Sequence, residues 1–246
     1  MHVAPPVLEK ARCYLDVQLS RPPLVSGSHQ APSGPFVTLS RECGSGGSAL
    51  ARVLVEHLPQ ACPPAEGEPA WTVFEQNIVQ HMLTSQDLSP QLARFLPEDR
   101  LSEVKSSVGE IVGLHPNLWD LVQRSNRFLR ECAQRGRAIL VGRGANFATA
   151  GIHGGIHIRL TAPLEHRERH MARVLACSDR QAAAHVRQVD AARRAYVRSV
   201  FDRDIADPLA YDLVINTARI PLDQAAGMVA DILAKRLQGV EAVAGA

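Results

Sequence analysis

The residues with the clearest chemical potential form a glycine-rich segment between a predicted strand and a predicted helix. Phe36-Val-Thr-Leu39 has the apolar character of a buried strand, and residues 49–58 have the spacing of an amphipathic helix. Between them lies Ser40-Arg-Glu-Cys-Gly-Ser-Gly-Gly-Ser48. Backbone N–H groups in such a turn converge at the helix N-terminus, where unpaired donors and the helix dipole favour an anion. The pattern predicts a phosphate site, although three glycines could also serve only tight packing.

This segment departs from the usual nucleotide-binding loop, G-x-x-x-x-G-K-[ST], at two positions. Arg41 stands at the first glycine and Gly47 at the lysine, while Ser48 keeps the hydroxyl that contacts Mg²⁺ in such loops. Lysine occurs only at positions 10, 105 and 235, so few lysines are available as substitutes. Backbone donors, Mg²⁺ and arginines such as Arg41 would then have to meet the phosphate charge.

A second group of candidate residues follows another predicted strand. The apolar run 138–141 leads into Gly142-Arg-Gly-Ala-Asn146, so Arg143 would leave its strand at the same edge of the sheet as the glycine loop. Its planar guanidinium suits bidentate contact with a phosphate. The alternative is that the two glycines only shape a turn and Arg143 pairs with a surface carboxylate.

Arginines also gather on two predicted helices, residues 163–177 and 179–198. If this helix pair closes over the glycine loop, its arginines would neutralise the charge on a transferring phosphoryl group. An ordinary solvated face explains the same pattern. Arg169 and Arg173 share one face of the first helix. On the second, Arg187, Asp190 and Arg194 recur at i, i+3 and i+7, with Arg193 and Arg198 nearby.

The elements that would position these residues alternate along the chain. Predicted strands at 36–39, 71–74, 138–141, 156–160 and 213–216 are separated by helical segments, among them 75–84, a helix that ends at 136, and 221–237. This alternation predicts a parallel sheet covered on both faces, with ligands beyond the carboxyl ends of its strands. Ser178 and Gln181 match a capping box at the start of the second arginine-rich helix. Residues 5–19 favour a short helix, 20–35 a linker, and 88–115 a segment broken by proline and glycine that could cover a substrate.

The amino-acid composition limits the classes of function that we expect for this chain. The chain has 246 residues, 46% of them hydrophobic, which is enough for a large α/β domain. Its 27 basic and 25 acidic residues nearly balance, so no general nucleic-acid binding is expected. No apolar run is long enough to cross a bilayer, and we expect a cytoplasmic protein. The five cysteines are scattered without C-x-x-C spacing, which favours reduced thiols.

In their order, these motifs resemble the cytidylate kinase-like family of P-loop nucleoside monophosphate kinases. The similarity runs from about residue 35 to 237, through Thr38-Leu-Ser-Arg-Glu-Cys-Gly-Ser-Gly-Gly47, Val141-Gly-Arg-Gly-Ala-Asn146 and residues 189–217. The resemblance implies a three-layer P-loop α/β fold with a parallel five-stranded sheet and a helical lid. It also implies Mg²⁺, ATP as phosphoryl donor and a nucleoside monophosphate, typically CMP or dCMP, as acceptor.

The resemblance implies three groups of site residues. Those at the donor phosphates are Arg41, Gly44, Ser45, Gly46, Gly47 and Ser48, with Ser48 also at the metal. Those at the acceptor are Glu75, Arg143 and Asn146, and the catalytic lid residues are Arg173, Asp190, Arg193 and Arg194. The implied organisation is an N-terminal helix and flexible linker (1–33), a kinase-like domain (34–240) and a tail (241–246). Within the domain, about 75–116 would cover the acceptor and about 164–205 would form the lid.

Departures from the family pattern leave other interpretations open. Typical cytidylate kinases carry Gly-Lys in the loop and aspartates around the middle arginine, where this chain has Val141 and Gly144. A regulatory nucleotide-binding protein without catalysis, or a phosphotransferase with another small acceptor, would fit these losses. The sequence gives no prediction of the oligomeric state.

Overall fold

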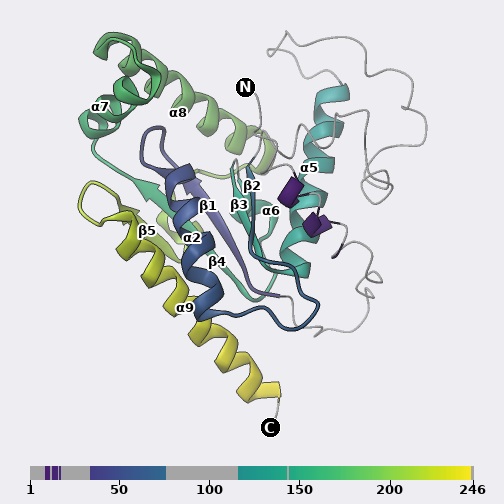
Figure 1. The fold of residues 1–246 in the computed structure, drawn as a ribbon. Coiled ribbons are helices and arrows are strands. Elements are labelled where there is room, and N and C mark those ends of the chain that lie inside the picture. Colours follow the sequence, from purple (N-terminus) through teal and green to yellow (C-terminus); the bar gives the residue numbers. More distant parts are fainter. Residues whose placement is uncertain are drawn as a thin grey trace.

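Five short strands form one parallel sheet in the part of the chain that the structure describes (Figure 1). This computed structural model describes residues 9–11, 13–15, 17, 34–75, 116–142 and 144–244. The strands are β1 (Phe36–Arg41), β2 (Thr72–Glu75), β3 (Ala138–Val141), β4 (Gly155–Thr161) and β5 (Leu213–Asn216). Their spatial order is β2-β3-β1-β4-β5, which places β1 and the glycine loop at the centre. The predicted α/β fold with a parallel five-stranded sheet is confirmed.

Helices cover both faces of this sheet. They are α2 (Gly47–Ala61), α5 (Pro116–Arg135), α6 (Ala145–Ala148), α7 (Leu164–Leu175), α8 (Asp179–Phe201) and α9 (Leu222–Ala244), with a 3₁₀ turn at Pro208–Ala210. None of the helices described is long and apolar enough to cross a membrane.

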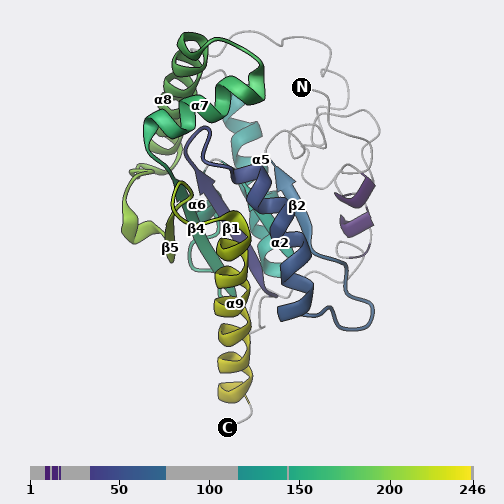
Figure 2. The same cartoon turned by 60° about the vertical axis from the view of Figure 1, so that its left-hand side comes forward.

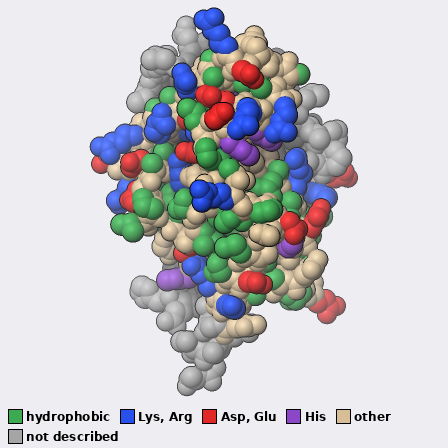
Figure 3. Space-filling view, turned by 90° about the vertical axis from the view of Figure 1, so that its left-hand side faces the viewer, with side chains coloured by type: hydrophobic (Ala, Val, Ile, Leu, Met, Phe, Trp, Pro, Cys, Tyr) green, Lys and Arg blue, Asp and Glu red, His purple; other side chains and the backbone are tan. Residues whose placement is uncertain are grey.

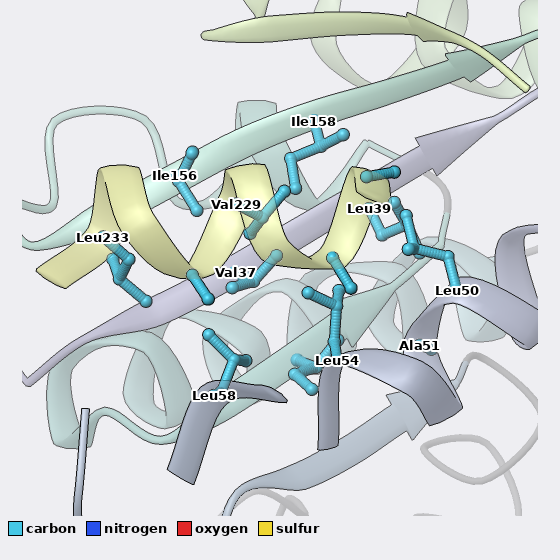
Figure 4. Close-up of a cluster of buried hydrophobic side chains, with 14 of the residues drawn as sticks. Val37, Leu39, Leu50, Ala51, Leu54, Leu58, Ile156, Ile158, Val229 and Leu233 are labelled. Atoms are coloured by element: carbon cyan, nitrogen blue, oxygen red, sulfur yellow. The ribbon is translucent and has the colours of Figure 1, made fainter. Parts of the chain in front are cut away.

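The alternation of side chains along β1 divides the core into two layers. Val37 and Leu39 point to the face covered by α2 and α9, where they pack among leucines and valines of both helices (Figure 4). Each fully buried side chain of this size contributes roughly 1.5–3 kcal/mol. Phe36 points to the opposite face and packs in the layer that α5 covers. Because side chains alternate, the buried Ser40 shares that second face with Phe36.

Helical residues near the N-terminus belong to the second layer. Tyr14 and Leu15 are each 1% exposed. The Tyr14 hydroxyl donates to the Gly136 carbonyl at 2.5 Å, and its ring meets the Phe74 ring edge-on at 5.1 Å between centroids. Burial raises the pKa of the Tyr14 phenol well above its usual value. The described residues of the helix expected within 5–19 therefore pack against the sheet layer through their apolar side chains.

Helices α7 and α8 form a hairpin at the carboxyl ends of the strands, above the glycine loop (Figures 1 and 2). We refer to residues 164–201 as the α7–α8 hairpin. Ala176 adopts a left-handed conformation, with φ 49°, that ends α7. Ser178 accepts from the Gln181 backbone N–H and donates its own N–H to the Gln181 side chain, which confirms the predicted capping box.

Some boundaries differ from the sequence-based expectation. Helix α8 runs to Phe201 rather than ending near residue 198, and it stops at Asp202, which is left-handed with φ 50°. Helix α9 continues to Ala244 because no proline interrupts residues 238–244. The short helix α6 was not expected. The predicted acceptor-covering segment lies mostly at residues 76–115, outside the described residues.

Candidate functional site

The glycine loop leaves β1 and turns directly into α2. Gly44 and Gly46 are left-handed, with φ 82° and 84°, a conformation that favours glycine. Gly46 is the N-cap of α2, no side chain caps the helix, and its first turn carries no acidic residue. The positive end of the helix dipole and the first backbone N–H groups are therefore left to attract an anion.

Hydrogen bonds within and beside the loop fix its shape. The Ser45 hydroxyl donates to the Glu42 carbonyl at 2.8 Å. On the other side, the Thr217 hydroxyl at the end of β5 donates to the Ser45 carbonyl at 3.0 Å. These contacts hold the loop between β1 and β5 before any ligand binds.

The Arg41 side chain lies where a loop lysine would begin. A Cβ atom added to Gly47 would lie 2.8 Å from Arg41 Cγ and 3.2 Å from Arg41 Cδ. A side chain at position 47 therefore competes with Arg41 for the same space. Of the donor-site residues predicted from the sequence, Ser45 and Gly47 are buried, Ser48 is exposed, and the others are partly exposed.

A buried ion pair joins the loop to the α7–α8 hairpin. Arg167 Nη1 of α7 lies 2.7 Å from Asp190 Oδ2 of α8, and the two side chains are 8% and 12% exposed. The other carboxylate oxygen of Asp190 accepts the Cys43 backbone N–H at 2.7 Å. Arg167 also donates to the Cys43 carbonyl at 3.0 Å and lies 3.2 Å from a Glu42 carboxylate oxygen. Asp190 is thus placed as an anchor of the loop.

A second contact follows one helical turn later on α8. Arg193 Nη1 donates to the Arg41 carbonyl at 3.0 Å, at the end of β1. Together with Asp190, it ties α8 to Arg41 and Cys43, at the strand end and in the loop. Burial raises the pKa of the Cys43 thiol between these anchors, so this thiol stays neutral near pH 7.

The remaining hairpin residues predicted as catalytic stay at the surface. Arg173 of α7 and Arg194 of α8 are exposed and do not join the buried ion pair. Figure 3 shows basic side chains, mixed with histidine and acidic ones, over the upper part of the molecule where Figures 1 and 2 place the hairpin. Both side chains are therefore open to solvent.

The residues predicted at the acceptor follow β2 and β3. Glu75 ends β2 and pairs in register with Val141, the last residue of β3. Asn146 of α6 is buried, its Nδ2 donates to the Ala210 carbonyl at 3.1 Å, and its Oδ1 has no partner within the described part of the chain. Arg143 lies outside the described residues. Glu75 at the end of β2 and Asn146 after β3 belong to strands whose carboxyl ends meet at the edge where the glycine loop sits.

Arg167 is the residue that sequence reasoning missed at this site. It stands in the charged run Glu165-His-Arg-Glu-Arg-His170, where every position has the composition of a solvated helix face. Only the fold shows that one of these arginines is 7% exposed and meets the loop. A Cβ on Gly44 would lie 2.6 Å from the Arg167 carbonyl oxygen, which shows how closely α7 approaches.

Comparisons with known proteins agree with this architecture. The crystal structure of an uncharacterized protein from Eubacterium ventriosum ATCC 27560 has a similar fold, with a TM-score of 0.60 over 82% of this chain and 98% of that chain. The two sequences are 16% identical, so this similarity concerns the fold alone. No curated protein matches this chain. The model of one protein family matches residues 36–219, from the first strand through the last. The chain therefore belongs to the cytidylate kinase-like family.

Proposed function

We propose that this protein transfers the γ-phosphoryl group of ATP to a nucleoside monophosphate, with CMP or dCMP as the preferred acceptor. Family membership supports nucleotide kinase activity. The observation that carries the proposal is the loop between β1 and α2, with its left-handed glycines and its uncapped helix N-terminus. An attacking phosphate oxygen of the acceptor needs no proton removed, so catalysis rests on positioning and charge neutralisation.

In this proposal, the glycine loop and Arg41 bind the phosphates of ATP, the phosphoryl donor. Backbone N–H groups from Gly44 to Ser48 would surround the β- and γ-phosphates. Since Arg41 lies against Gly47, its guanidinium would supply the charge that a loop lysine supplies elsewhere. The difference in geometry is that Arg41 reaches the loop from the strand end, whereas a lysine would rise from the helix.

The residues present fit Mg²⁺ bound together with the nucleotide. Ser48 is the exposed second residue of α2, and within the described ranges no cluster of three or more His, Cys, Asp or Glu side chains could hold a metal ion alone. Mg²⁺ usually takes few protein ligands alongside substrate phosphates and water. Ser48 would hold it, and the ion would neutralise phosphate charge.

The α7–α8 hairpin is proposed as the lid over the transferring group. Arg173 and Arg194, both exposed, would contact the phosphoryl group when substrates are bound. Arg193 and Asp190 would keep the hairpin attached to the loop during this contact. On the other side of the sheet edge, Glu75, Arg143 and Asn146 would bind the acceptor.

A coupled assay with ATP, Mg²⁺ and a panel of CMP, dCMP, UMP, AMP and GMP tests the activity. The variant Gly46→Val should lose ATP binding in calorimetry, because a β-branched residue at φ 84° cannot keep the loop conformation. Gly151→Val is the matched control, since Gly151 has φ 80°, has open space around it, and lies at the opposite end of the strands. It should suffer similar strain and still bind ATP.

Two results would contradict the proposal in different ways. Equal ATP affinity in Gly46→Val and Gly151→Val would remove the loop from nucleotide binding. ATP binding by the wild type without turnover of any monophosphate would favour the regulatory alternative, for which Gly47 in place of lysine is the supporting observation.

A further inference from the structure

Arg159 is a buried arginine near the candidate site. Among the residues that the structure describes, no carboxylate balances its charge. Arg159 lies in β4 and is 7% exposed. Its Nη1 donates to the Ser40 hydroxyl at 3.2 Å, and its guanidinium carbon lies 5.7 Å from the centre of the Tyr211 ring. Within the described ranges, no Asp or Glu side chain forms an ion pair with it.

Two other arginines give a direct comparison, because Arg137 and Arg167 are also 7% exposed. Arg137 pairs with Glu68 and donates to the Cys62 and Pro63 carbonyls. Arg167 pairs with Asp190 and Glu42. A guanidinium stays charged at any physiological pH, and burying it without a counter-charge is costly. Among the buried arginines that the structure describes, Arg159 is therefore the one without a carboxylate partner, and an anionic ligand would match its charge.

The position of Arg159 indicates which ligand this is. Arg159 pairs in register with Ser40, one residue before the end of β1, so both lie near the carboxyl ends of the strands. Their side chains point away from Val37 and Leu39, hence away from α2 and the donor loop on its N-terminus. They face the side on which α6 and Tyr211 lie.

Contacts around Tyr211 join this arginine to the predicted acceptor residues. The Tyr211 hydroxyl donates to the Ile205 carbonyl at 2.8 Å, and its oxygen lies 3.3 Å from the Ser40 hydroxyl oxygen. The preceding residue, Ala210, accepts the Asn146 amide. Ser40, Arg159 and Tyr211 thus form a fixed cluster next to Asn146, whose Oδ1 also lacks a partner among the described residues.

We propose that Arg159, held by Ser40 and Tyr211, binds the phosphate of the acceptor nucleotide. This inference rests on the proposed function and adds a residue to it. A phosphate monoester carries close to two negative charges at pH 7 and accepts the paired N–H groups of a guanidinium. The buried position would make Arg159 the floor of the acceptor site, with ATP on the opposite side of β1.

Binding of CMP and of cytidine to the full chain, measured by calorimetry without ATP, tests the inference. Arg159→Met should lower CMP affinity by about 10- to 100-fold, the effect of losing a charge-assisted contact. Cytidine, which lacks the phosphate, should bind wild type and variant equally, and ATP affinity should not change. Because an unmatched buried charge is removed, the melting temperature should stay the same or rise.

Arg137→Met is the matched control, because it removes an equally buried arginine that has its carboxylate partner and lies at the amino end of β3. It should lower the melting temperature and leave the affinity for CMP unchanged in the folded fraction. Unchanged CMP affinity in Arg159→Met, a melting temperature lowered as in Arg137→Met, or no CMP binding by the wild type would each overturn the inference. CMP binding that depends on Arg159, with no turnover in the coupled assay, would support this phosphate site while refuting the kinase proposal.

Discussion

Asp190→Asn is the substitution that most directly tests how the hairpin holds the glycine loop. The change keeps the shape of the side chain and one oxygen to accept the Cys43 N–H. It removes the negative charge that faces Arg167 at 2.7 Å. Arg167 would then be left buried with only Glu42 near its guanidinium.

The expected cost follows from the burial of the pair. Removing one partner of a buried ion pair destabilises a protein by about 3–5 kcal/mol. Because Glu42 still lies 3.2 Å from Arg167, we take the lower end, about 3 kcal/mol. For a chain of this size each kcal/mol lowers the melting temperature by roughly 2–4 °C, so a decrease of roughly 6–12 °C is expected.

Differential scanning calorimetry at pH 7 measures this decrease, with Asp202→Asn as the matched control. Asp202 caps the end of the same helix and lies 3.5 Å from Arg198, but the two side chains are 89% and 71% exposed. Exposed pairs contribute at most about 1 kcal/mol, and asparagine tolerates the left-handed conformation of this residue. The control should therefore melt within a few degrees of the wild type.

One result would refute the reasoning about the loop anchor. If Asp190→Asn and Asp202→Asn melt at the same temperature, the pair with Arg167 does not hold the hairpin against the loop. Calorimetric titration with ATP adds a second readout, because a loosened loop should bind ATP more weakly in Asp190→Asn and normally in Asp202→Asn.

Three further predictions concern the charges around the site. Gly47→Lys should not raise turnover, because its side chain displaces Arg41, whereas combining it with Arg41→Ala should raise kcat/KM above that of Arg41→Ala alone. Arg194→Ala should lower kcat by about 10²–10³ with little change in ATP affinity, while Arg180→Ala, an exposed arginine near the start of the same helix, should keep the wild-type kcat; equal values would exclude Arg194 from the mechanism. Burial lowers the pKa of His157 below 6.5, so the unfolded state takes up this proton first and stability falls as the pH drops below about 6.5, by at most about 1.4 kcal/mol per pH unit. In His157→Gln, melting curves between pH 7 and pH 5 should show a smaller decrease, and an unchanged pH dependence would contradict this explanation.

The strands were predictable because each is a short apolar run bounded by turn residues. The run 138–141 lies between glycines at 136 and 142, and it forms β3 as expected. The glycine loop was predictable for a similar reason. Its turn requires left-handed residues at positions 44 and 46, and the glycines that allow this conformation are visible in the sequence. Helix ends were predictable only where a local signal exists, as at Ser178.

The charged contacts of the site were not predictable in the same way. Cys43 and Asp190 are 147 positions apart, and no periodicity links a backbone N–H to a distant carboxylate. Arg167 resembles its solvated neighbours in the sequence. Arg159 did leave a signal that could have been used, because it stands between Ile158 and Leu160, both buried, in a strand that the sequence predicts. An arginine buried within a strand needs an opposite charge nearby.

The packing of Tyr14 has a practical consequence for how this protein is shortened. The family match begins at residue 36, and a recombinant fragment cut there would lose the tyrosine. The carbonyls of Cys132 and Gly136 would lose a hydrogen-bond donor, and the ring of Phe74 would be uncovered. Gly136 lies at the turn that leads into β3, the strand before Arg143. Fragments that begin before residue 9 are therefore the appropriate starting material for crystals and for enzymology.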